Sequence, residues 1–591
     1  MSEKKSFWNK PRKGPSALIA GFMVIACSIF VVVFALGLLS AKNNSIKNLL
    51  TFALLISIGI SAALAVVFAL GRWLFCWRNM RRTLFGLVCL ATLLALFYAE
   101  ENWRGKYTWE KYRREQEAEG EQFDLKSIAP QAVPDAQNFA MTPMWIEEIC
   151  ASMGPEKARK WYGDKVAALG HTNFVSKLRM PIELSGRGLE STNQSGGWTQ
   201  GEKFDLRLWQ EYYRKFAATT NFFPIAPQPQ TPAADVLLAL SKYDATIQEL
   251  RAASQLPFSR FPLGYEEDNP AMIVLPHLSL FRQIALMLQL RAVAELELGQ
   301  TEKALDDIKL ILRLTKTIRN EPIFISHLVR MSVLQIGLQP VWQGLAEQRW
   351  SDAQLLTLET EFSQFDFLAD YLFAIRSERI MSIGAIDFMK RSRDFEMLAY
   401  SGEDELWESG KVVSSILYRL APSGWFEQNK ISISRMNYEY LLPIVDMEKH
   451  VISLSTVAKA KKALEKLPPS PFTWFDRLFL PALGSIPPKF AYAESVTDMA
   501  RIACALESYR LAHESFPETL AALTPKFLEK IPHDIINGQS LNYRLTTNGQ
   551  FILYSVGWNG TDDGGSIVMG KGKTPGVDTK QGDWVWKYPA N

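Results

Sequence analysis

Three long apolar segments without a charged residue lie within the first hundred residues. They cover Ser16–Ala41, Leu49–Gly71 and Thr83–Ala99. A transmembrane α-helix needs about 20 predominantly apolar residues, with about 17 as the lower limit. The third segment lies close to this lower limit. A secretory signal peptide has a shorter apolar region and a cleavage site, which three successive segments do not match. The sequence predicts an anchor of three transmembrane helices, with a buried core hairpin as the alternative for the third segment.

Lysine and arginine flank these segments unevenly. The N-terminal tail, residues 1–15, is basic, and so is the loop between the second and third segments, whereas the first loop carries only Lys42 and Lys47. Basic flanks stay in the cytoplasm, so the predicted order is inside, outside, inside. The third segment then leads outward, and everything after Glu100 lies on the extracytoplasmic side. If the third segment does not span, the large domain lies in the cytoplasm instead.

Composition narrows the classes of function. The 591-residue chain has a formal net charge of +3, which does not match the basic footprint of a nucleic-acid-binding protein, so we expect no nucleic-acid partner. No charged residue lies within the apolar segments, which argues against a pump or transporter. Beyond these segments the only cysteines are Cys150 and Cys504. They are either two separately buried small residues or, in an oxidising compartment, one disulfide.

Changes in composition divide the rest of the chain, and the whole is expected to be mainly α-helical. The Pro-rich stretches are interpreted as connectors and the periodic stretches as helical. The predicted parts are a charged helix and Pro-containing linker (100–143), a mixed segment (144–231), a helical repeat-like domain (232–467), a connector rich in proline and aromatic residues (468–490) and a small α+β domain (491–591). The charged stretch 100–122 is expected to be a solvated helix that continues the third apolar segment.

Two successive helices are predicted over residues 279–318. Apolar residues recur three and four apart in both, and Gly299 stands between them, where a left-handed residue ends a helix. This pair resembles a tetratricopeptide-type helix pair. A weaker second unit follows, in which Ser351 caps the second helix. The resemblance implies a groove or concave face for a protein or peptide partner, and a plain helical domain is the alternative. A broad groove lined by aromatic residues such as Trp342 and Trp350 would favour a scaffold role.

The last hundred residues combine one helix with strands. Residues Ser495–His513 form an amphipathic pattern, and the segments LNYRLT and QFILYSV follow, joined across Thr547-Asn548-Gly549. Asn-Gly between two strand-like segments predicts a β-hairpin, because both turn residues adopt positive φ. A loop rich in glycine and aspartate, Gly557–Gly565, comes next.

These C-terminal motifs resemble the globular domain of the major pseudopilin of type II secretion systems. The matching stretches are Ala505–Pro517, Leu528–Asp534 and Leu553–Gly565. The resemblance implies a calcium site made by the loop and one downstream aspartate, formed here by Asn559, Asp562, Asp563 and either Asp578 or Asp583. The alternative is that these residues only fill a tight turn. Pseudopilins carry one hydrophobic helix that runs directly into this domain, and none is expected before Ser495, so the resemblance implies a fold and not pseudopilus assembly.

No catalytic motif appears in the sequence. The six histidines do not form HExxH or another ligand spacing, there is no GxSxG motif, and GSIVMGKGK departs from the phosphate-binding loop pattern. The layout also resembles uncharacterised membrane-anchored bacterial proteins, which implies the inner membrane with a periplasmic domain. The predicted function is a membrane-anchored interaction or scaffold protein. The alternatives are an envelope hydrolase, with its site in Met144–Thr231 or at the domain junction, and a sensor or transport accessory subunit.

Overall fold

A computed structural model describes most of the chain after the second apolar segment. The described residues are 28, 31, 32, 35, 77–178, 197–267, 269–393, 419–468, 470–547, 549–570 and 576–588. They are mainly helical, with a few short strands. The chain divides into two compact units, Met1–Trp103 and Arg104–Asn591. Apart from residues 28, 31, 32 and 35, the first two predicted transmembrane segments fall outside the described residues.

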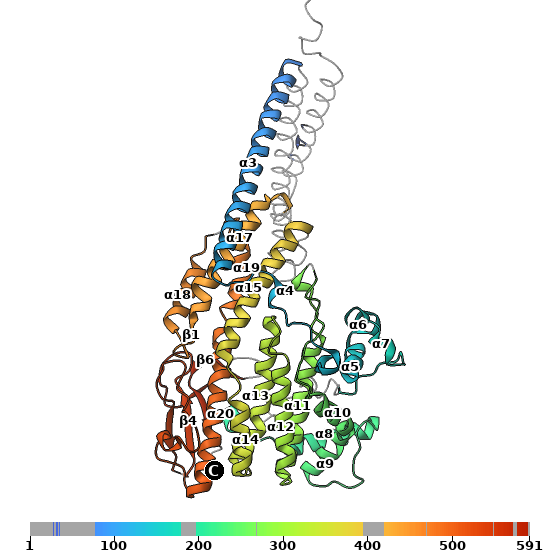
Figure 1. Cartoon of the computed structure of the whole chain (residues 1–591), viewed down its shortest axis with the longest axis vertical. Helices are drawn as coiled ribbons and strands as arrows, with labels where there is room; N and C mark the ends of the chain where they lie inside the picture. Colours follow the sequence, from blue (N-terminus) through green and yellow to red (C-terminus); the bar gives the residue numbers. More distant parts are fainter. Residues whose placement is uncertain are drawn as a thin grey trace, which may run out of the picture. The chain divides into compact units, whose positions relative to one another are not determined.

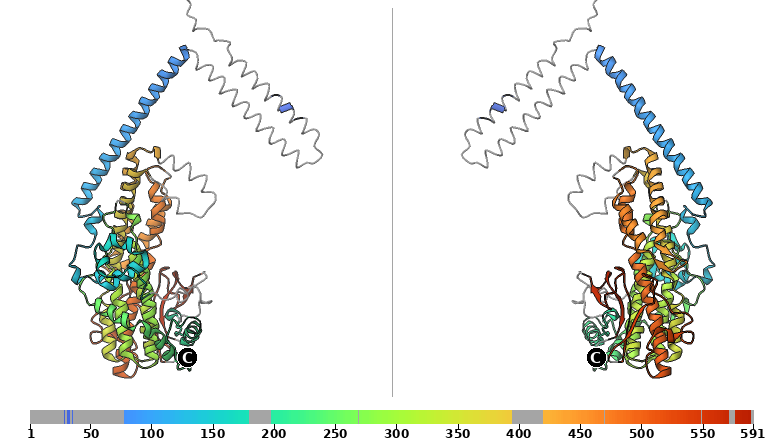
Figure 2. Two further views of the ribbon diagram at one scale, coloured as in Figure 1. Left: turned by 90° about the vertical axis from the view of Figure 1, so that its right-hand side faces the viewer. Right: turned by 90° about the vertical axis from the view of Figure 1, so that its left-hand side faces the viewer.

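One long helix, α3 (Trp77–Ala118), contains the third apolar segment and runs without a break into the charged stretch that follows (Figure 2). Within the part of the chain that the structure describes, it is the one helix long and apolar enough to cross a membrane. The apolar side chains of its first half are exposed; Phe85, for example, is 72% exposed and Leu93 is 65% exposed. The predicted helical character of the third segment and its continuation past Glu100 are therefore confirmed.

The charged half of α3 is not only a solvated helix, contrary to the prediction. A Cβ atom on Gly105 would collide with the backbone of Gly424, so the two backbone segments are in direct contact at these glycines. Trp109 is buried with Ile383 and Ile431, which lie on two other helices. The many charges in the sequence concealed this contact, because they occupy the other faces of the helix.

Five helices run side by side in the larger unit: α11 (Pro276–Glu297), α12 (Thr301–Thr317), α13 (Phe324–Ala346), α14 (Asp352–Phe362) and α20 (Pro487–His513) (Figure 1). Gly299 has φ 73°, which ends α11 as predicted. Ser351 forms a capping box with Gln354 at the start of α14, as the sequence also predicted. A further helix, α15 (Phe367–Ser392), packs against α13 and α20.

Helix α20 is longer than the predicted helix Ser495–His513. It begins at Pro487, within the expected connector, and its N-terminal half is buried. Pro487 and Pro488 occupy the first helical positions, where a missing N–H costs no hydrogen bond. The sequence predicts a connector at these prolines, whereas in the structure they begin the helix. The rest of that segment holds another helix, α19 (Trp474–Leu483).

The strands in the described residues form three small antiparallel sheets. The predicted hairpin is confirmed: β3 (Asn542–Leu545) pairs with β4 (Phe551–Ser555), with Leu545 opposite Phe551. Strand β7 (Trp584–Lys587) pairs with the other edge of β4. The two remaining pairs are β5 (Ile567–Met569) with β6 (Val577–Gly582) and β1 (Val445–Asp446) with β2 (Val451–Ile452).

Shorter helices surround this framework. In the segment 144–231, predicted to be mixed, short helices alternate with turns and irregular stretches where the chain is described. The bounds are α4 (Leu125–Ile128), α5 (Pro143–Met153), α6 (Pro155–Tyr162), α7 (Lys165–Ala168), α8 (Leu206–Thr220), α9 (Pro232–Leu240), α10 (Asp244–Ala253), α17 (Ser423–Met436) and α18 (Leu454–Glu465). A π-helical turn, Asn437–Leu441, follows α17.

The helical segment and the C-terminal α+β segment share one hydrophobic core. Side chains of α11–α15 cluster with those of α20, β4 and β7, including Trp584 and Trp586. A second cluster unites α5–α10 with the opposite side of α11 and α12. Cys504 lies in the first cluster and Cys150 in the second, and both are free thiols, so they do not form a disulfide. The segments predicted as separate domains therefore form one compact unit.

Candidate functional site

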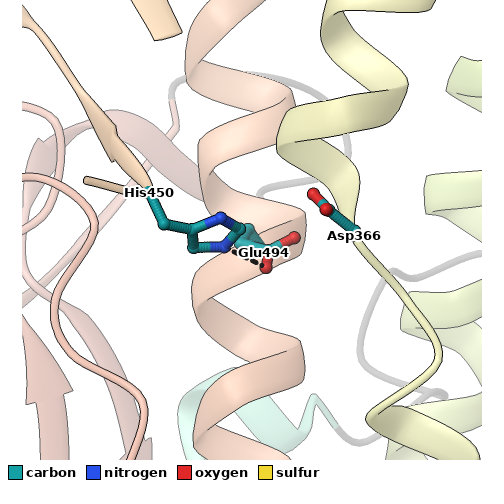
Figure 3. Close-up of side chains that lie close together, drawn as sticks. All are labelled: Asp366, His450 and Glu494. Atoms are coloured by element: carbon teal, nitrogen blue, oxygen red, sulfur yellow. Dashed lines mark hydrogen bonds and ion pairs between the residues drawn. The ribbon is translucent and has the colours of Figure 1, made fainter. Parts of the chain in front are cut away.

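Three side chains from distant parts of the larger unit gather where α15, α20 and the β1–β2 hairpin meet. They are Asp366, His450 and Glu494, whose ligand atoms all lie within 4.8 Å of one another (Figure 3). Among the described residues this is the group with the side-chain chemistry of a metal site.

Glu494 forms the buried floor of the cluster. It lies in the fully packed N-terminal half of α20 and is 4% exposed. Its Oε2 accepts a hydrogen bond from the backbone N–H of Phe367 at 2.6 Å, and its Oε1 lies 3.0 Å from Nε2 of His450. These two contacts therefore fix the orientation of the Glu494 carboxylate.

Asp366 stands at the N-cap of α15, in the short connection from α14. Its Oδ1 accepts a hydrogen bond from the backbone N–H of Ala369 at 2.8 Å, which is the usual role of aspartate at a helix start. The next residue, Phe367, donates its N–H to Glu494. One turn of backbone thus positions both carboxylates.

His450 closes the β1–β2 hairpin just before β2. Its φ of 53° is in the left-handed region, which few residues other than glycine adopt. Its carbonyl oxygen lies 3.2 Å from Nε2 of His533, so a second segment of the chain holds the hairpin. The imidazole is about one-third exposed, so the cluster has one side open to solvent.

Burial and neighbouring charges change the protonation of this region. Burial raises the pKa of Glu494, and the hydrogen bond to Glu494 raises the pKa of His450. Burial, reinforced by the Glu494 charge, raises the pKa of Asp498 to about 8. The guanidinium of Arg501 pairs with Asp498 and Glu359. Burial therefore favours the protonated form of both carboxyl groups, and the hydrogen bond favours the protonated imidazole.

A cavity of about 530 Å³ lies next to the hairpin. Its lining residues are Lys449, Val451, His533, Ile536, Asn537 and Gly538. Lys449 and Val451 are the sequence neighbours of His450, so the cavity and the cluster share one short segment of backbone. The arrangement has the chemistry to bind a cation through one imidazole and two carboxylates.

The predicted calcium ligands lie mostly in one loop after β4. Asn559 donates from Nδ2 to Oδ2 of Asp563 at 2.8 Å, and Tyr554 donates its hydroxyl to Asp562 at 3.1 Å. Asp562 and Asp563 are exposed. The structure therefore brings the three loop residues of the predicted set close together.

The two candidate downstream aspartates differ. Asp583 is buried, and its carboxylate accepts hydrogen bonds from the backbone N–H groups of Asp563, Gly565 and Ser566. Asp578 instead accepts a hydrogen bond from the N–H of Lys580 within β6. Of the two, Asp583 is the residue attached to the loop. Burial raises its pKa despite these three hydrogen bonds.

Trp342 and Trp350 do not line a groove, so the feature that would favour a scaffold role is not found at these residues. Both are buried, at 0% and 2% exposure, and their indole N–H groups donate to backbone carbonyl oxygens of Lys587 and Val341. The C-terminal sheet and α20 cover the face of the helical layer that these tryptophans occupy. The repeat-like pattern indicated the helices correctly but not what covers them.

Sequence reasoning also missed Asp366, His450 and Glu494. His450 and Glu494 are 44 positions apart, and Phe367 is 127 positions from the carboxylate it binds. No short motif joins residues at such separations. The polar residues Glu494 and Asp498, in a helix that also carries many apolar residues, were the one sign of a special role.

No family model matches this chain, and no curated protein or solved structure is significantly similar to it.

Proposed function

We propose that the chain is a multi-pass inner-membrane protein that holds residues 104–591 on the extracytoplasmic side, as a module that binds a protein or peptide. One observation carries the membrane part of this proposal. The first half of α3 exposes apolar side chains on all sides, whereas from Gly105 onward the same helix packs against the larger unit. A helix that is apolar all round belongs in lipid.

The interaction role rests on the helical layer and on the resemblance of α11 and α12 to a tetratricopeptide-type pair. The larger unit is one compact body with a shared core, which suits a rigid binding module. Because Trp342 and Trp350 are buried, the partner binds elsewhere on this surface.

Extraction and reciprocal binding test the proposal. The full chain should stay in the membrane pellet after alkaline carbonate treatment and should enter detergent micelles. A partner that co-purifies from native membranes should bind again when both proteins are purified separately. Release by carbonate contradicts the anchor, and failure of purified components to bind contradicts the interaction role.

The envelope hydrolase is the second candidate, and the Asp366–His450–Glu494 cluster favours it. Three protein ligands with an open position, next to a cavity, are typical of catalytic zinc sites. This cluster lies at the junction where the sequence placed the alternative site. A His450→Ala variant that keeps partner binding but loses hydrolysis of an ester, phosphoester or peptide substrate would support the hydrolase.

We also propose that the loop of Asn559, Asp562 and Asp563 binds calcium together with Asp583. The resemblance to the pseudopilin domain and the closeness of these residues support it. Calcium accepts carboxylate and amide oxygens in flexible geometry, which an exposed loop can supply.

A further inference from the structure

We propose that Asp366, His450 and Glu494 bind a divalent transition-metal ion of the zinc class. This inference goes beyond the proposed interaction role and does not depend on it. It starts from three ligand atoms, within 4.8 Å of one another, contributed by three separate segments of the chain.

The spacing of the donors suits such an ion. Tetrahedral zinc with bonds of about 2.1 Å places neighbouring donor atoms about 3.4 Å apart. Nε2 of His450 and Oε1 of Glu494 are 3.0 Å apart, close to this value. In Figure 3 the carboxylate of Asp366 lies on the side of Glu494 away from His450, and a short movement of this partly buried side chain completes the set.

Backbone groups orient the ligands from behind. The N–H of Phe367 holds Oε2 of Glu494, and the N–H of Ala369 holds Oδ1 of Asp366. Outer hydrogen bonds of this kind fix the direction of metal-binding carboxylates. The left-handed backbone of His450 belongs to the same arrangement, because such conformations gather at functional sites.

Asp366, which caps α15 through Oδ1, places a second carboxylate beside the histidine–glutamate ion pair. The pair of exposed His171 and partly buried Glu147 gives the comparison within this chain, because there Lys177 binds the same glutamate. In the Asp366–His450–Glu494 cluster, the carboxylate of Asp366 lies near the glutamate, where the other pair has a lysine. Arg501 pairs with Asp498 and Glu359. Two close carboxylates repel each other, and a divalent cation between them removes that repulsion.

The donor set also selects the metal. One imidazole and two carboxylates suit zinc and its neighbours, whereas calcium and magnesium prefer oxygen ligands alone. Three protein ligands leave a fourth position for water or a bound group. The exposed face of His450 gives the ion a path from solvent.

The experiment uses the full chain in detergent, stripped with a chelator and titrated with zinc chloride. Calorimetry gives the affinity, and cobalt chloride gives a second readout through the visible bands of tetrahedral Co²⁺. Three variants remove ligands: His450→Ala, Glu494→Gln and Asp366→Asn. Asparagine caps a helix as well as aspartate does, so Asp366→Asn keeps the fold and removes only the charge. His171→Ala is the matched control.

We expect one zinc ion per chain, with tetrahedral cobalt bands, in the wild type and in His171→Ala. Asp366→Asn and His450→Ala should weaken zinc binding by about 100-fold or more, at or above the largest loss caused by removing an outer hydrogen-bond partner. Zinc binding that is equal in Asp366→Asn and the wild type would show an adventitious ion and overturn the proposal. Absence of zinc binding to the wild type would also overturn it, and would leave the proposed interaction role untouched.

Discussion

At the scale of single residues, Glu295 shows how burial controls protonation in the helical layer. It is 2% exposed in α11, where Arg291 lies 3.7 Å away and shares its charge with Asp307. Burial, reinforced by the Asp307 charge, raises the pKa of Glu295 to about 8. The folded chain therefore holds a proton that the unfolded chain releases near the usual glutamate pKa.

This proton makes stability depend on pH. Because the folded state binds it more tightly, its contribution is complete below about pH 4.5 and disappears as pH rises to about 8. Relative to Glu295→Gln, which cannot ionise, wild-type unfolding free energy should fall by up to about 1.4 kcal/mol per pH unit across this window. Chemical denaturation of the full chain between pH 5 and 9 measures the difference. Glu518→Gln, at an exposed position, is the control, and parallel curves for Glu295→Gln and wild type contradict the assignment.

The calcium proposal is also tested at single residues. With calcium at 100 times its dissociation constant, the wild type should gain about 2.7 kcal/mol and melt at a higher temperature than in chelator. Asp563→Asn should lose this gain, because it removes a loop carboxylate, whereas Asp578→Asn, which faces Lys580, should keep it. The full chain is needed, because the C-terminal segment shares its core with α11–α15. An unchanged wild-type melting temperature counts against the site.

At the scale of elements, two glycines of α3 form a matched pair. A Cβ on Gly105 would collide with the backbone of Gly424, whereas a Cβ on Gly86 would meet nothing within 4 Å. Gly105→Ala should destabilise the larger unit by about 1–3 kcal/mol, although alanine favours helix formation. Gly86→Ala should leave that stability unchanged. Thermal unfolding of both variants in detergent measures the effect, and equal melting temperatures would mean that the crossing at Gly105 is not needed.

Some elements of the fold can be predicted from the sequence and others cannot. Helices α11, α12 and α14 and the β3–β4 hairpin follow from local patterns, because Gly299 and Ser351 act on their own neighbours. The start of α20 was missed, because two prolines favour a connector as much as a helix start. The cluster at His450 was missed for a different reason. It depends on tertiary packing between segments that no local pattern relates.

At the scale of the whole molecule, the central claim is that α3 crosses the membrane and leads the larger unit out of the cytoplasm. The exposed apolar side chains in the first half of α3 support the proposal that this helix crosses the membrane. The direction rests on the basic residues that precede it, Arg72 to Arg82.

Labelling with a membrane-impermeant maleimide tests this claim most directly. Ser515→Cys adds an exposed thiol to the larger unit, whose own cysteines, Cys150 and Cys504, are buried. Ser6→Cys adds one to the N-terminal tail as the opposite control. In intact spheroplasts, Ser515→Cys should be labelled at once and Ser6→Cys only after lysis. Labelling of Ser515→Cys only after lysis would place the larger unit in the cytoplasm and contradict the account.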